Sequence, residues 1–239
     1  LAERCLGLAL EAVEADFVRR HGQVPGPDGR PVRLIIRNYG HADFAALIDI
    51  QRECFPPPFP SELWWNEQQL ANHVSLFPAG ALCVEVDGQL VGSMTGLIVQ
   101  LDHPNQQHSW AEVTDEGYIR THNPDGNTLY IVDISVRPSA RKLGIGKLLM
   151  QSMYELVIHL GLDRLLGGGR MSGYHKASDS MSAEAYLDAV LRGERSDPVI
   201  SFLLRCGRTP VGVAANYLDD EESRNYAAIM EWRNPFRSR

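Results

Sequence analysis

A short basic loop between a predicted strand and a predicted helix constrains the fold of this chain more than any other feature. The apolar stretch 128–136 precedes the loop Arg137-Pro-Ser-Ala-Arg-Lys-Leu-Gly-Ile-Gly-Lys147, and an amphipathic stretch extends from the loop to Leu160. A second apolar stretch, 164–168, follows directly. A strand–helix–strand crossover normally joins two parallel strands with a right-handed connection. We therefore expect a sheet that contains these two strands as a parallel pair.

The composition of this loop predicts a site for a polyphosphate. The N-terminus of a helix presents unpaired N–H groups and the positive end of the helix dipole. Gly144 and Gly146 lack Cβ atoms where an anion must approach the backbone. The loop also gathers four basic residues and no acid, although the whole chain has a formal net charge of −7 (Arg137, Arg141, Lys142 and Lys147).

Two common phosphate-binding motifs do not fit the loop. A P-loop requires Ser or Thr after its lysine, and Leu148 follows Lys147. A dinucleotide-binding fingerprint requires a third glycine, and Leu149 stands at that position. An ordinary basic turn at a solvated helix start is the alternative interpretation.

The remaining hydrophobic pattern predicts an α+β chain. Further strands are expected at 32–37, 81–86, 89–99, 208–213 and 226–232, and helices at 44–55, 61–76, 182–192 and 198–206. Asp87-Gly88 favours a tight hairpin between two of these strands. Residues 1–22 have the pattern of an amphipathic helix, and the Pro- and Gly-rich stretch 24–31 has that of a linker. We therefore divide the chain into an N-terminal helix and linker, 1–31, and a domain, 32–239.

Composition excludes several classes of function. A chain of 239 residues with 44% hydrophobic and 22% charged residues can bury a core, and its acidic balance argues against nucleic acid as a partner. No apolar run is long enough to span a membrane, so we expect no membrane partner. The four cysteines lack CxxC spacing, which favours a reducing, cytoplasmic location. The eight histidines show no HExxH motif, and we predict no metal.

The loop sequence also resembles a known family. Arg141, Gly144 and Gly146 satisfy the pattern [Arg/Gln]-x-x-Gly-x-[Gly/Ala], and a strand ending in Val136-Arg-Pro138 precedes it. This arrangement resembles the GNAT superfamily of N-acetyltransferases, and the order of elements matches that family from residue 32 to residue 232. The segments His108-Ser-Trp110, Gly173-Tyr-His175 and Asn216-Tyr217 look like the acetyltransferase domain that some bacterial proteins carry ahead of a nitrilase-type hydrolase domain.

The resemblance implies a fold, a cofactor and a set of contacts. The fold would be a mixed, mostly antiparallel sheet of about seven strands flanked by helices. The protein would transfer the acetyl group of acetyl-CoA to a primary amine by direct attack in a ternary complex. The strand before the loop would splay from its neighbour and hold the pantetheine arm through Ile134, Ser135 and Val136. The loop would hold the pyrophosphate through Arg141, Lys142, Leu143, Gly144, Ile145, Gly146 and Lys147.

The same resemblance suggests where catalytic groups should lie. The family often places its base on the strand before the loop, where Tyr130 and Asp133 are the polar candidates. Asp133 is unusual within an Ile- and Val-rich strand, although a structural carboxylate bound to backbone amides or to an arginine is an equal alternative. Leu203 occupies the position of the tyrosine that usually protonates the thiolate. Tyr174 and His175 are candidates to replace it, and solvent is another.

The sequence says least about the acceptor. We expect the amine to enter between residues 42–76, 100–127 and 169–176, opposite the pyrophosphate loop. The amine itself is not identified, and a homodimer is compatible with the sequence. Because Leu203 removes the usual acid, a catalytically silent acyl-CoA-binding module with a regulatory role is the alternative function.

Overall fold

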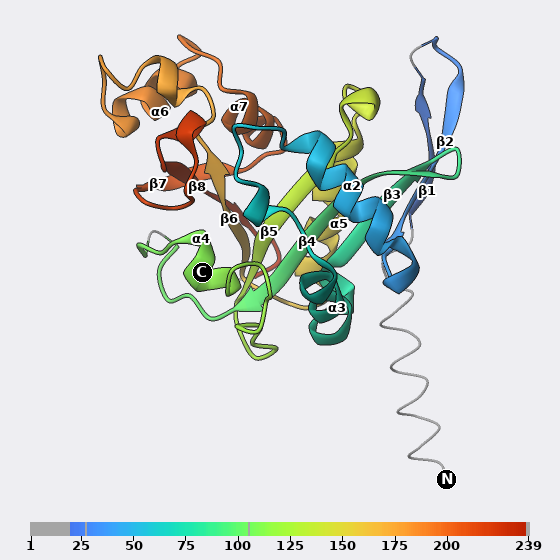
Figure 1. Cartoon of the computed structure of the whole chain (residues 1–239). Helices are drawn as coiled ribbons and strands as arrows, with labels where there is room; N and C mark the ends of the chain where they lie inside the picture. Colours follow the sequence, from blue (N-terminus) through green and yellow to red (C-terminus); the bar gives the residue numbers. More distant parts are fainter. Residues whose placement is uncertain (1–19, 27, 105, 238–239) are drawn as a thin grey trace.

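A single eight-stranded sheet organises the protein (Figure 1). The computed structural model describes residues 20–26, 28–104 and 106–237. The strands follow the spatial order β1-β2-β3-β4-β5-β6-β8-β7. Their bounds are β1 Arg20–Pro25, β2 Pro31–Asn38, β3 Ala81–Val86, β4 Gln89–Val99, β5 Thr128–Val136, β6 Arg164–Arg170, β7 Thr209–Ala214 and β8 Ala227–Arg233.

The pairing of the two central strands differs from all the others. Every neighbouring pair in the sheet is antiparallel except β5 and β6, which are parallel. These two strands pair only over Thr128–Tyr130 and Arg164–Leu166, at their first residues. Beyond Tyr130 they diverge, so one edge of β5 is released from the ladder. The predicted splayed pair is therefore present.

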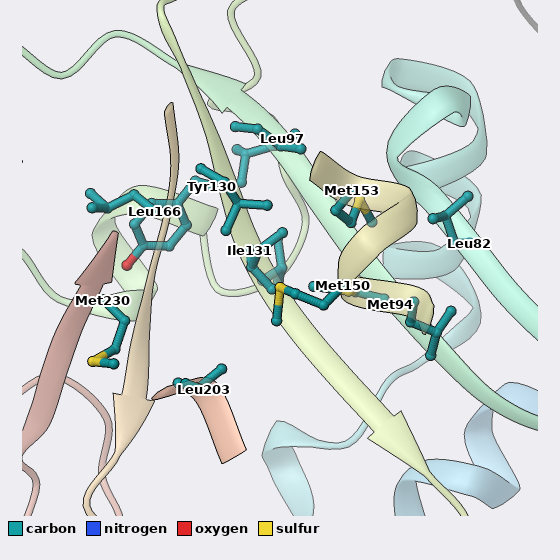
Figure 2. Close-up of a cluster of buried hydrophobic side chains, with 14 of the residues drawn as sticks. Leu82, Met94, Leu97, Tyr130, Ile131, Met150, Met153, Leu166, Leu203 and Met230 are labelled. Atoms are coloured by element: carbon teal, nitrogen blue, oxygen red, sulfur yellow. The ribbon is translucent and has the colours of Figure 1, made fainter. Parts of the chain in front are cut away.

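Helices cover both faces of the sheet. In Figure 1, α2 (Phe44–Cys54) crosses one face over β4 and β5, and α5 (Ile145–His159) lies on the other. The apolar side of α5 buries Leu149, Met150 and Met153 against the strands, as Figure 2 shows for the two methionines. The described residues also form the α-helices α3 (Glu67–Leu76), α4 (Trp110–Thr114), α6 (Ala183–Leu191) and α7 (Pro198–Arg205).

Local sequence explains where several of these elements begin and end. Asp87 and Gly88 form the β3–β4 turn with φ of 49° and 80°, as expected for this dipeptide. Asp197 caps α7 by accepting bonds from the backbone of Val199 and Ile200, and Pro198 occupies the first helical position. The predicted hairpin at Asp87-Gly88 and the predicted start of a helix at residue 198 are therefore confirmed.

Two predicted elements are wrong or incomplete. The expected helix over 1–22 falls outside the described residues except for 20–22, which belong to strand β1, and most of the expected linker forms a hairpin between β1 and β2. The sheet therefore has eight strands, where about seven were expected. The helix predicted for 61–76 begins only at Glu67, because Asn66 forms a capping box with Gln69. Within the described ranges, no helix combines the length and the apolar character needed to cross a membrane.

Candidate active site

A cavity of about 1340 Å³ opens where β5 and β6 diverge. One wall is the released edge of β5 from Ile131 to Val136, and the opposite wall comes from β6 and α7. The basic loop, residues 140–147 apart from Leu143, closes one end. The fold thus brings the predicted pantetheine strand and the predicted phosphate loop into one continuous space.

The loop has the geometry of an anion site. Gly144 adopts a left-handed conformation with φ of 76° at the N-cap of α5, where no side chain of the described residues caps the helix. A Cβ at Gly144 would meet no described atom within 4 Å, so the space before the helix is open. The first amides of α5 are therefore available to a ligand that lies in the cavity.

Gly146 has a second reason to be glycine. A Cβ at this position would lie 3.0 Å from the Phe202 ring of α7. The missing side chain lets α7 approach α5 closely, and the two helices together form the end of the cavity near the loop. Gly144 and Gly146 therefore serve different purposes: the first allows the turn, and the second allows the packing.

The charge of the cavity is opposite to that of the chain. Among the described residues that line it, eight are basic and two are acidic: Arg141, Lys142, Lys147, Arg170, Lys176, Arg195, Arg205 and Arg208 against Asp133 and Glu222. The whole chain has a formal net charge of −7. Clustered charge of one sign in a cleft raises the local concentration of oppositely charged ligands.

A bulge reshapes β5 at the centre of the cavity. Thr95 of β4 faces Asp133 and Gly96 faces Ile131, so Val132 is an extra residue on β5. The Nε1 of Trp110 donates a hydrogen bond of 3.0 Å to the carbonyl oxygen of Val132. The bulge therefore turns the strand where β5 leaves β6, and Trp110 holds it from the side of α4.

Asp133 lines the cavity within a small polar cluster. Its Oδ2 accepts hydrogen bonds of 2.8 Å from Gln51 Nε2 and of 2.8 Å from Ser135 Oγ. Gln51 comes from α2 and also donates to Ser135 Oγ at 3.0 Å. Burial raises the pKa of Asp133 to about 6, against the lowering effect of these donors. The carboxylate is thus ionised near neutral pH, yet it is basic enough to accept a proton.

The second candidate on this strand, Tyr130, has no exposed surface. It extends from β5 toward β6 (Figure 2) and bonds to His108 Nε2 and Tyr217 Oη, each at 2.8 Å. Tyr130 is absent from the described residues that line the cavity, whereas Tyr217 is among them. Any contact between Tyr130 and a ligand would therefore pass through Tyr217.

The two candidates for the general acid lie side by side on the loop after β6, but in different surroundings. His175 lines the cavity, and its Nδ1 lies 2.9 Å from the carbonyl oxygen of Glu222. Tyr174 is buried and donates from its hydroxyl to the carbonyl oxygen of Met181 at 3.0 Å. Tyr174 does not belong to the described lining of the cavity, so its contacts support a structural role.

Leu203 and Arg208 lie on the α7 side of the cavity. Leu203 is buried and lines the cavity where the resemblance expected a phenol. Arg208 is only 3% exposed, and its guanidinium donates to the carbonyl oxygens of Gly167 and Met230. Its Nε has no partner among the described residues, and burial lowers its pKa to about 10. A positive charge therefore sits at the point where β5 and β6 separate.

The segments that were expected to surround an acceptor reach the cavity in part. All three predicted segments contribute to the cavity: Phe55, Phe59 and Trp65 from the first, Trp110 from the second, and Arg170 and His175 from the third. Tyr118, Arg120 and His122 of the second segment are outside the described lining. Apolar rings thus surround the side on which Asp133 is held.

Sequence reasoning missed Gln51, Tyr217 and Arg208 as lining residues. Gln51 gave a signal, because it is a polar residue on the apolar stripe of α2 and is 2% exposed. The other two reach the cavity only through the packing of β6, β7 and β8. Over the described part of the chain, no group of three or more His, Cys, Asp or Glu side chains could hold a metal ion.

A family model and a close relative in sequence point to the same family. The sequence model of the acetyltransferase (GNAT) family matches residues 44–177. The uncharacterized N-acetyltransferase YkwB of Bacillus subtilis (strain 168) is 56% identical over 210 residues, which are 87% of this chain and 93% of that protein. The probable hydrolase YhcX of the same strain is 38% identical over 203 residues, which are 84% of this chain but only 39% of YhcX.

A solved structure shows the same fold. The GphF GNAT-like decarboxylase, in complex with isobutyryl-CoA, superposes with a TM-score of 0.68 at 22% sequence identity. The superposition covers 83% of this chain and 98% of that one. At this identity the likeness concerns the fold, which is the mixed, mostly antiparallel sheet flanked by helices that the sequence predicted.

Proposed function

Because this chain belongs to the acetyltransferase (GNAT) family, we propose that it transfers the acetyl group of acetyl-CoA to a primary amine. The observation that carries the proposal is the continuous cavity between β5 and β6. It joins a basic helix N-terminus at one end to the Asp133 carboxylate at its centre. Such a cavity suits a long phosphorylated thioester whose reactive end must meet an amine.

Acetyl-CoA would lie along the wall of β5. The pyrophosphate would rest on the amides at the start of α5, beside Arg141, Lys142 and Lys147. The pantetheine arm would follow the released backbone edge of Ile134, Ser135 and Val136. The thioester would then reach the bulge at Val132, where a main-chain N–H released from the ladder could donate to the developing oxyanion.

The amine would approach from the side of α2. An ammonium ion must lose a proton before it can attack, and Asp133 is placed to accept that proton. Attack on the thioester carbonyl would then form the C–N bond directly, without a covalent enzyme intermediate. Among the described residues, Cys54, Cys83 and Cys206 are free thiols, which is in keeping with a reducing, cytoplasmic location.

The thiolate leaves without a phenol at position 203. Leu203 offers no proton, and Tyr174 is held by Met181, so solvent is the proton donor we favour. His175 is the side chain of this loop that could contribute, because it faces the cavity. An acid is less necessary here than a base, because a thiolate is a good leaving group at neutral pH.

The alternative function, a silent acyl-CoA-binding module, rests on the same Leu203. The deciding experiment measures thiol release from acetyl-CoA with a panel of primary amines, together with acetyl-CoA binding by calorimetry. Turnover of any amine supports the transferase. Binding without turnover of any amine contradicts it and favours the module.

A further inference from the structure

A continuous chain of hydrogen bonds leads away from the cavity at Tyr217. The amide of Gly168 on β6 lies 3.1 Å from Tyr217 Oη, which lies 2.8 Å from Tyr130 Oη. Tyr130 Oη lies 2.8 Å from His108 Nε2, and His108 Nδ1 lies 2.7 Å from the carbonyl oxygen of Gln106. Tyr217 lines the cavity, both phenols are buried, and His108 is partly exposed. The chain therefore joins the cavity to the surface.

The direction of each hydrogen bond in this series follows from the bond between His108 and Gln106. A carbonyl oxygen can only accept, so His108 must carry its proton on Nδ1. Burial lowers the pKa of His108 below its usual range, so the ring is neutral near pH 7 and its Nε2 accepts. Tyr130 must then donate to His108, and Tyr217 must donate to Tyr130. At the other end the amide of Gly168 donates to Tyr217, which agrees with this direction.

The surrounding structure holds the members of this chain in place. Gly168 is glycine where a Cβ would overlap the ring of Tyr217. The backbone amide of Trp110 donates to the carbonyl oxygen of Tyr217 at 2.8 Å, which fixes the loop that carries His108 against Tyr217. The ring of His108 also meets the ring of Tyr130 edge to face, with centroids 5.4 Å apart.

We propose that Tyr217, Tyr130 and His108 form a proton relay that carries a proton from the acceptor amine to the surface of the protein. The proposal rests on the proposed acetyl transfer. Such a transfer must remove two protons from an amine that arrives as an ammonium ion: one before attack, and one from the N–H of the tetrahedral adduct. Asp133 can take the first. The relay provides a separate route for the second.

The transfer balances without any further reactant. The N–H bond of the adduct breaks as an O–H bond forms at Tyr217. The former Tyr217 proton passes to Tyr130 Oη, and the former Tyr130 proton passes to His108 Nε2. The electron pair of the N–H bond stays on nitrogen, and no group is oxidised or reduced. The imidazolium then releases its Nδ1 proton, on the exposed side of the ring, to solvent. Proton exchange with solvent returns the ring to the Nδ1-protonated form, and the two hydroxyls rotate back.

Two charged groups bear on the relay. The positive charge of Arg208 lowers the pKa of both Tyr130 and Tyr217, against burial, and so favours the partial negative charge that each oxygen carries during transfer. Glu112 lies close enough to His108 to raise its pKa slightly and thus to favour the imidazolium. Asp133, the proposed acceptor of the first proton, is hydrogen-bonded to Gln51 and Ser135 and does not belong to the relay.

The test compares variants in which each member is replaced by a residue of similar size that cannot pass a proton on. Tyr217→Phe, Tyr130→Phe and His108→Gln should each lower kcat for thiol release by roughly 10²-fold with little change in KM for acetyl-CoA. Tyr154→Phe is the matched control, because its buried hydroxyl donates to the carbonyl oxygen of Cys206 outside the relay. This control should leave kcat nearly unchanged.

Two further readouts separate a relay from a structural role. Added imidazole should restore activity to His108→Ala in proportion to its concentration, because it can replace the terminal proton acceptor. Nitrogen NMR of the wild-type protein should show His108 as the neutral ring protonated on Nδ1. An Nε2-protonated His108 overturns the relay. The relay is also overturned if Tyr130→Phe and His108→Gln turn over as fast as the wild-type protein. That result would leave the proposed acetyl transfer intact. Failure of the wild-type protein to turn over any amine overturns the proposed function itself.

Discussion

At the scale of single residues, the raised pKa of Asp133 links activity to stability. A carboxylate whose pKa is about 6 in the folded protein and 3.8 in the unfolded chain contributes stability that is fully present below pH 3.8 and is lost as the pH rises from 3.8 through 6. At pH 7 the buried charge therefore costs up to about 3 kcal/mol.

Asp133→Asn should consequently be less active and more stable at neutral pH. We expect kcat to fall by roughly 10²-fold while acetyl-CoA affinity is kept, and the free energy of unfolding to rise at pH 7 but not at pH 3.5. Urea titrations at the two pH values measure the second effect. A variant that is destabilised and loses acetyl-CoA affinity would mark Asp133 as structural.

Gly144 offers a second residue-scale prediction with an internal control. Gly144 and Gly88 have φ of 76° and 80°, and a Cβ at either would meet no described atom within 4 Å. Alanine at either site should cost about 1–2 kcal/mol of stability, because the left-handed conformation disfavours a side chain. Only Gly144→Ala should also reduce the rise in Tm caused by acetyl-CoA, since Gly88 lies in a distant hairpin. Equal ligand-induced shifts in both variants would contradict the phosphate site.

At the scale of elements, the contact between α2 and β5 tunes the proposed base. Gln51 donates to the Asp133 carboxylate and thus lowers its pKa. Gln51→Leu should therefore raise the pKa of Asp133 and move the acidic limb of kcat/KM to higher pH. Ser135→Ala should move it in the same direction, because Ser135 Oγ is the other side-chain donor. An acidic limb that neither variant moves would exclude Asp133 as its origin.

The same scale shows what the sequence could and could not predict. Strands β2 to β8 were predictable because each is an apolar run, and α5 and α7 because apolar spacing and capping residues agree. Strand β1 could not be found, since His21, Gly22 and Gln23 have no alternating apolar pattern and gain their order by pairing with β2. At the site, the phosphate loop is local in sequence. The relay is not: His108, Tyr130 and Tyr217 meet only through tertiary packing.

At the scale of the whole molecule, the basic cavity in an acidic chain predicts a strong effect of salt. Dissolved ions screen the attraction between the eight lining basic residues and a phosphorylated ligand. Rising salt concentration should therefore weaken acetyl-CoA binding steeply in calorimetric titrations. S-acetylpantetheine has no phosphate groups, and salt should leave its weaker binding almost unchanged. Equal salt dependence for the two ligands would argue against a polyphosphate in this cavity.

The short pairing between β5 and β6 has a mechanical consequence. Main-chain bonds join one half of the sheet, β1 to β5, to the other half, β6 to β8, through only the first residues of the two central strands. A pantetheine arm bound along the open edge would take the position of the missing ladder and connect the halves. In that case the thioester is both a reagent and a temporary link between the two halves of the sheet. Each turnover removes that link when the spent cofactor departs.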